Sequence, residues 1–105
     1  MARYEVRYER EAEGDLDYLG RKVEAMVRPG VLKYLADQPL PAVGQRKALD
    51  TNPLNAAYRL QLGDYRVYYD VDAEARTVWV LRVGYKRGET LYLLYLRGRP
   101  VPMRD

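Results

Sequence analysis

Strict alternation of apolar and polar residues begins the chain. Residues 3–8, RYEVRY, place Tyr4, Val6 and Tyr8 on one face and charged side chains on the other. Because side chains alternate between the two faces of a strand, this pattern predicts a half-buried β-strand. The same charged start differs from the apolar segment of a signal peptide.

From residue 9 to about residue 37, apolar residues recur at steps of three and four. The recurring positions are Leu16, Leu19, Val23, Val27, Val31 and Leu35. This period is typical of an amphipathic helix. Gly20 is expected to end a first helix, and Pro29, followed by Gly30, to kink or break a second one. The pattern predicts a helical hairpin that ends before Pro39 and Pro41.

Further strands are predicted in the second half of the chain, after a loop over residues 38–57. AYRLQL (57–62) and YRVYYDV (65–71) flank Gly63-Asp64, which suits a two-residue hairpin turn. TVWVLRVG (77–84) follows, with Trp79, Leu81 and Val83 expected on the buried face. TLYLLYL (90–96) is expected to be a strand or an extended arm, and residues 97–105 a loose tail.

This order of elements predicts a single α+β domain over residues 1–105. We expect a small twisted antiparallel sheet of about four strands, with the helical hairpin packed on one of its faces.

The hairpin turn determines which residues share the other, polar face of the sheet. With a two-residue turn, Gln61 lies opposite Arg66, and Arg59 lies opposite Tyr68. The expected register of the next hairpin places Arg66 opposite Arg82, and like charges in that position favour an anion between them. Three further polar residues follow just beyond this strand: Lys86, Arg87 and Tyr92. The pattern indicates a concave anion-binding face, but it is also ordinary on a solvated antiparallel sheet.

Composition limits the chemistry open to such a face. The 105 residues include no Cys and no His, which removes disulfides, thiolates and the usual imidazole base and metal ligand. No metal or cofactor is therefore expected. No apolar run is long enough to span a bilayer, so we expect a soluble cytoplasmic protein.

The net charge of +3 is unevenly distributed. The last 25 residues contain two acidic residues, Glu89 and Asp105, and six basic ones, Arg82, Lys86, Arg87, Arg97, Arg99 and Arg104. This surplus favours a local anion site over a broad nucleic-acid coat, and a solvated basic tail would also explain it.

The segment YRLQLGDYRVYYDVDAEARTVWVLRVGYKRGETLY (58–92) resembles the toxins of the RelE/ParE superfamily, found in bacterial type II toxin–antitoxin pairs. The matching features are YRL, GDYRVYY, a short acidic hairpin, VLRVG, a basic pair and a tyrosine. The strand and helical hairpin over residues 3–38 fit the same fold. For RelE-like members, the resemblance implies binding of mRNA in the ribosomal A site. The RNA is cut there by attack of its own 2′-OH on the adjacent phosphate.

The resemblance also implies roles for individual residues. Arg66 matches an arginine placed to contact the scissile phosphate, and Arg59 falls where RelE has a catalytic-site lysine. Lys86 falls at the position of a donor to the leaving oxygen, and Tyr92 matches a tyrosine that orients the nucleotide. Further contacts with RNA are expected from Gln61, Tyr68, Arg82 and Arg87.

One departure from the RelE pattern keeps the activity open. Gln61 replaces the lysine favoured as general base, and an amide cannot accept a proton at neutral pH. Either Lys86 or Arg87 covers this role weakly, or the protein does not cut RNA. ParE-like members have lost much of the basic set and inhibit DNA gyrase, and a member without toxic activity is a third alternative.

The resemblance implies one partner whichever activity holds. This partner is a cognate antitoxin that wraps the toxin in a hetero-oligomer. TLYLLYL and part of the eleven tyrosines offer apolar surface for docking.

Overall fold

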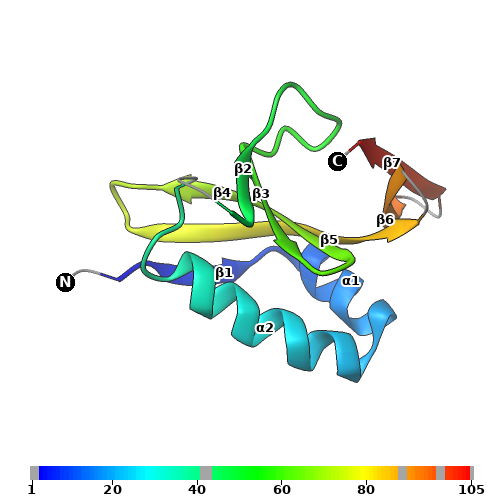
Figure 1. The fold of residues 1–105 in the computed structure, drawn as a ribbon, viewed down its shortest axis with the longest axis horizontal. Helices are drawn as coiled ribbons and strands as arrows, with labels where there is room; N and C mark the ends of the chain where they lie inside the picture. The colour runs from blue at the N-terminus through cyan, green and yellow to red at the C-terminus, as the bar shows by residue number, and fades with distance from the viewer. Residues whose placement is uncertain (1–2, 41–43, 88–89, 97–98, 105) are drawn as a thin grey trace.

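The computed structural model describes the backbone of residues 3–40, 44–87, 90–96 and 99–104, and side chains over residues 3–40 and 44–86 together with Met103. In this part of the chain, two helices pack against one seven-stranded sheet. The elements are β1 (Glu5–Tyr8), α1 (Arg10–Leu19), α2 (Arg21–Leu35), β2 (Arg46–Ala48), β3 (Tyr58–Leu62), β4 (Tyr65–Asp72), β5 (Thr77–Arg87), β6 (Thr90–Leu96) and β7 (Arg99–Arg104). Figure 1 shows both helices on one side of the sheet, which confirms the predicted α+β class.

The β3–β4 hairpin has the register predicted from its turn. Leu62 pairs with Tyr65, and Gln61 pairs with Arg66. Gly63 adopts a φ of 60°, a left-handed conformation that glycine reaches at low cost. A local turn signal was therefore sufficient to fix the pairing of these two strands.

The sheet is mixed and wider than the predicted antiparallel sheet. Its strand order is β2-β3-β4-β5-β6-β7, and β1 pairs with β5 in parallel. The chain leaves β1 through two helices, and a long crossover of this kind can join parallel strands whereas a tight hairpin cannot. The expectation of a purely antiparallel sheet was wrong for this reason.

A β-bulge interrupts the pairing of β4 with β5. Tyr69 pairs with Val80 and Tyr68 pairs with Arg82, so Leu81 has no partner on β4. A bulge adds one residue to one strand and shifts the phase of its side chains. Without the bulge, the register of Tyr69 with Val80 would place Val83 opposite Arg66, and the extra residue moves this partner on to Gly84. The predicted pairing of Arg66 with Arg82 was therefore wrong by two residues, of which the bulge accounts for one.

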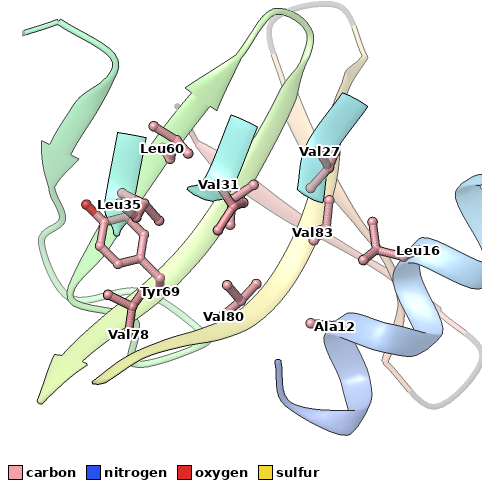
Figure 2. Packing of buried hydrophobic residues seen from close by; sticks show 11 residues of the cluster. Ala12, Leu16, Val27, Val31, Leu35, Leu60, Tyr69, Val78, Val80 and Val83 are labelled. Atoms are coloured by element: carbon pink, nitrogen blue, oxygen red, sulfur yellow. The ribbon is translucent and has the colours of Figure 1, made fainter. Parts of the chain in front are cut away.

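The main core lies between the helices and the sheet (Figure 2). Its buried members are Ala12, Leu16, Val27, Val31, Leu35, Leu60, Val67, Tyr69, Val78, Val80 and Val83. The bulge explains why Val80 and Val83 both belong to it, although they are three residues apart. Trp79 and Leu81, which we expected in this core, lie outside the cluster.

Helix α2 continues through Pro29, so of the two expected effects, a kink or a break, the break does not occur. A proline inside a helix costs about 3 kcal/mol. Val27, Val31 and Leu35 are fully buried on this helix, and each such burial contributes about 1.5–3 kcal/mol. Packing on the sheet therefore outweighs the local preference of Pro29.

The C-terminal segment is ordered as a strand over residues 99–104, where a loose tail was expected. β7 pairs with β6, and Met103 is only 3% exposed. Met103 packs in a second buried cluster with Ala56 and Tyr68. The apolar positions of this segment acquire a partner only in the folded chain, so its sequence alone did not reveal the strand.

Candidate nucleic-acid interface

Four basic residues lie on the sheet face that points away from the helices. Lys47, Arg59, Arg66 and Lys86 form what we call the cationic face. Arg59 and Arg66 alternate with the core residues Leu60 and Val67, so their side chains belong to the opposite face. The strands β2 to β5 bring together residues separated by up to 39 positions in the sequence.

Strand β2 was absent from the sequence prediction, and it supplies Lys47. Lys47 pairs directly with Arg59. Directly opposed residues on antiparallel strands have Cβ atoms about 4.5–5.5 Å apart, and like charges there are destabilising. Two basic residues are therefore directly opposed at Lys47 and Arg59, and not at Arg66 and Arg82 as the sequence had suggested.

Arg66 occupies the centre of the cationic face. It lies between Gln61 on β3 and Gly84 on β5. Its Nη1 donates hydrogen bonds to the carbonyl oxygens of Gly63 at 2.7 Å and Tyr65 at 3.1 Å. Arg66 is only 2% exposed, so the expectation that it lies on an open solvated surface was wrong. The contacts hold the guanidinium in one orientation.

Lys86 lies at the rim of the cationic face and is exposed. It follows Gly84 by two residues, so it lies diagonal to Arg66. Its backbone amide donates a hydrogen bond to the carbonyl oxygen of Asp64 at 2.6 Å. This bond ties the end of β5 to the β3–β4 turn and fixes the backbone from which Lys86 projects.

Arg82, in contrast to the residues of the cationic face, forms a buried ion pair with Asp15. Its Nε and Nη2 donate to the two carboxylate oxygens of Asp15 on α1, both at 2.8 Å. Hydrogen bonding to Asp15 is the main cause that raises the pKa of the Arg82 guanidinium, and burial opposes it. Because the pair is buried beneath α1, we leave Arg82 out of the proposed RNA contacts.

Asp15 also completes the edge of β5. β1 pairs with β5 as far as Val80, and β6 pairs with it from Gly84 onward. In the gap, the backbone amide of Val83 donates to Asp15 Oδ2 at 2.9 Å. The bidentate ion pair thus joins helix α1 to the bulged part of the sheet.

A cover of apolar residues lies over part of the cationic face. Ala56, Tyr68 and Met103 are buried together, and three partly buried side chains pack against them: Leu49, Leu54 and Leu81. Figure 1 shows the green β2–β3 connection and β7 on this side of the sheet. Tyr68, predicted to contact RNA, is 1% exposed in this cluster.

The β2–β3 connection is held by Asn52. Its side-chain oxygen accepts hydrogen bonds from the amides of Leu54 and Ala56, both at 3.1 Å. Its Nδ2 donates to the carbonyl oxygens of Asp50 and Ala56, both at 2.8 Å. The sequence predicted a loop over residues 38–57 but did not show that it covers the sheet.

Tyr92 and Arg87 are placed by their backbones only. Tyr92 pairs with Tyr85 and Pro102, and Arg87 pairs with Thr90. Their side chains lie outside the described residues. The roles predicted for Tyr92 and Arg87 therefore stay predictions.

The cationic face can hold an anion and stabilise charge. Arginine offers several N–H donors in a planar fork that matches a phosphate. Gln61 adds an amide donor and acceptor opposite Arg66. Among the described residues, no cluster of acidic side chains could hold a metal ion.

Comparison with known proteins gives the class of this fold. The profile described as the ParE toxin of the type II toxin–antitoxin system parDE matches residues 6–89. A solved structure, the toxin–antitoxin complex RelBE2 from Mycobacterium tuberculosis, contains a chain that is 31% identical. The match has a TM-score of 0.70 and covers 82% of this chain and 94% of that chain. None of the curated protein sequences matches this chain.

The fold is therefore that of a toxin from a type II toxin–antitoxin system. The chain belongs to the ParE toxin family, within the RelE/ParE superfamily that the sequence predicted. In the described part of the chain, neither helix is long and apolar enough to cross a membrane.

Proposed function

We propose that this toxin cleaves mRNA in the ribosomal A site, in the cytoplasm, by attack of a 2′-OH on the adjacent phosphate. The observation that carries the proposal is the directly opposed Lys47–Arg59 pair beside Arg66. A phosphate between these side chains would relieve their mutual repulsion. The 31% identity to a chain of the RelBE2 toxin–antitoxin complex supports the toxin class within which this proposal is made.

The cationic face suggests a division of roles in that reaction. The 2′ oxygen forms a bond to phosphorus while the bond from phosphorus to the 5′ oxygen breaks, leaving a cyclic phosphate and a 5′ hydroxyl. Arg66 and Arg59 stabilise the extra charge on the phosphorane. Lys86 donates a proton to the departing 5′ oxygen.

Removal of the 2′-OH proton is the weakest step. Gln61 can hydrogen-bond the hydroxyl but cannot accept its proton, and the chain contains no histidine. The proton then passes to solvent, so charge stabilisation supplies most of the acceleration. We expect cleavage to rise with pH and to be slow compared with an enzyme that has a general base.

The test is cleavage of a message on programmed ribosomes, mapped by primer extension. Wild-type protein should produce cuts at defined A-site codons, and the Lys47→Ala and Arg66→Ala variants should lose them. Lys47 is exposed, so its replacement should leave thermal stability unchanged. Lys22→Ala, an equal charge change on an exposed site of α2, serves as the matched control and should cut normally.

Inhibition of DNA gyrase is the second candidate. Two observations favour it: Arg66 is buried, and Gln61 occupies the position expected for a base. Wild-type protein that stops growth and blocks gyrase supercoiling, but produces no ribosomal cuts, would establish this function and refute RNA cleavage.

We also propose a cognate antitoxin as partner, as in the RelBE2 complex. Co-expression of the neighbouring gene product should restore growth and yield a co-purifying complex. If the toxin is purified alone from such cells and still stops growth, that neighbour is not its antitoxin.

A further inference from the structure

A pocket opens where helix α2 meets the end of the β3–β4 hairpin. Its volume is about 450 Å³, within the usual range for sites that take small ligands. The residues that matter for its chemistry are Met26, Lys33, Tyr34, Gln45, Gln61 and Leu62. None of the residues that line it in the described part of the chain is acidic.

We propose that this pocket binds one nucleobase of the RNA strand that crosses the cationic face. The inference rests on the proposed function and extends it, because it identifies where a base next to the cut is recognised. Gln61 provides the connection, since it lines the pocket and also lies directly opposite Arg66. A strand with a phosphate at Arg66 can therefore place a neighbouring base around the edge of β3.

The walls of the pocket are held in place by hydrogen bonds to backbone carbonyl oxygens. The amide of Gln61 donates to the carbonyl oxygen of Gln45 at 2.8 Å. Arg46 Nη1 donates to the carbonyl oxygen of Tyr34 at 3.2 Å. These bonds join α2, β2 and β3 around the opening, so the site is formed before a ligand arrives.

The floor of the pocket is shaped by Gly30. A Cβ atom placed on Gly30 would lie only 3.0 Å from a terminal carbon of Leu62. The glycine lets α2 approach β3 closely and keeps Leu62 as an apolar floor. Met26 is an exposed apolar residue on the same helix and forms another wall.

The polar side chains suit a base more than an apolar peptide side chain. Gln45 and Gln61 each present one amide donor and one acceptor group, the pattern that reads a base edge. Lys33 Nζ lies 5.2 Å from the centre of the Tyr34 ring, and an exposed lysine there can bind the adjoining phosphate. Unpaired, splayed-out bases are the usual targets of sequence-specific RNA recognition.

A second pocket shows the contrast. It is smaller, at about 310 Å³, and Glu9 and Glu11 line it together with Leu54, Leu81 and Arg82, whose guanidinium is paired with Asp15. Two carboxylates would repel an RNA phosphate. Of these two cavities, the one at α2 and β3 therefore has the charge and the polar groups that a nucleotide requires.

The experiment uses a ribosome-bound message that cannot be cut. The attacking nucleotide carries a 2′-deoxy sugar, and thiouridine is placed at one neighbouring position at a time. After irradiation, crosslinked toxin peptides are identified by mass spectrometry. We expect one thiouridine position to crosslink within residues 26–34 or 61–63.

Variants make the result specific. The double variant Lys33→Ala/Gln45→Ala should lower the yield of this crosslink about tenfold and relax base preference at the same position in cleavable messages. Lys22→Ala should match wild type. Arg66→Ala should abolish cleavage at every position, because it acts on the phosphate rather than on one base.

The other outcomes overturn the proposal. Crosslinks confined to the sheet, with unchanged base preference in the double variant, would refute the pocket and leave RNA cleavage standing. No crosslink to any part of the toxin, together with no cutting by wild type, would refute both. If the double variant weakens antitoxin binding and leaves RNA contacts unchanged, the pocket binds the protein partner instead.

Discussion

Replacement of Asp15 by asparagine should remove a large share of the stability of the domain. The carboxylate accepts two hydrogen bonds from Arg82 and one from the Val83 amide, and the side chains of Asp15 and Arg82 are only 4% and 6% exposed. Asparagine has nearly the same shape but takes the bidentate carboxylate away from the buried Arg82 charge. Breaking such a pair costs about 3–5 kcal/mol, out of a total of roughly 5–15 kcal/mol for a small domain.

Urea unfolding followed by circular dichroism measures this loss. With a urea dependence of about 1–3 kcal/mol per M, the midpoint should fall by roughly 2 M. Asp37→Asn is the control, because its ion pair with Arg3 has a similar distance of 3.1 Å but side chains that are 59% and 65% exposed. This control should lose less than about 1 kcal/mol.

Equal losses in the two variants would refute the reasoning, since burial would then have no effect. The double variant Asp15→Leu/Arg82→Met provides an independent check. It removes both charges and leaves neither unpaired, so it should be more stable than Asp15→Asn. A double variant that is less stable would show that the hydrogen bond to Val83, and not the charge pair, dominates at this edge of β5.

Three further predictions concern the stability of the domain. Gly14 lies in α1, and a Cβ atom placed on it would have nothing within 4 Å. Gly14→Ala should therefore raise the free energy of unfolding by about 0.5–1 kcal/mol. Gly20→Ala should lower it, because Gly20 has a φ of 99° that alanine adopts only with strain. Burial raises the pKa of the Tyr69 hydroxyl, so folding favours its protonated form. Stability measured by urea titration should therefore fall as the pH rises above about 10. The fall should be less steep in Tyr69→Phe. Met103→Ala should cost about 2 kcal/mol or more and speed hydrogen exchange in β7, while the exposed Met26→Ala should change stability by less than about 0.5 kcal/mol.

Local signals in the sequence were sufficient for the helices and for one hairpin. The three- and four-residue period found the helical hairpin, and Gly20, with its φ of 99°, divides α1 from α2 as expected. Gly63-Asp64 gave the correct register for β3 and β4. In each case the residues that decide the structure lie next to one another in the chain.

The errors arose where distant segments decide the outcome. The three residues of β2 are too few for a recognisable alternation, and their strand exists because β3 supplies an edge. β7 contains two prolines and pairs only because β6 lies beside it. As a result, the sequence missed Lys47 and missed the cover over the cationic face. The same long-range packing buried Arg66, which alternation alone had assigned to solvent.

The bulge at Leu81 explains how the sheet separates a structural arginine from a candidate functional one. If the pairing of Tyr69 with Val80 continued without interruption, Arg82 would lie opposite the core residue Val67. The extra residue instead places Val83 opposite Val67 and frees Arg82 to bind Asp15. It also brings Gly84, which has no side chain, opposite Arg66. One inserted residue thus protects the core from a charge, anchors α1, and sets the strand position opposite the residue on which the proposed phosphate site depends.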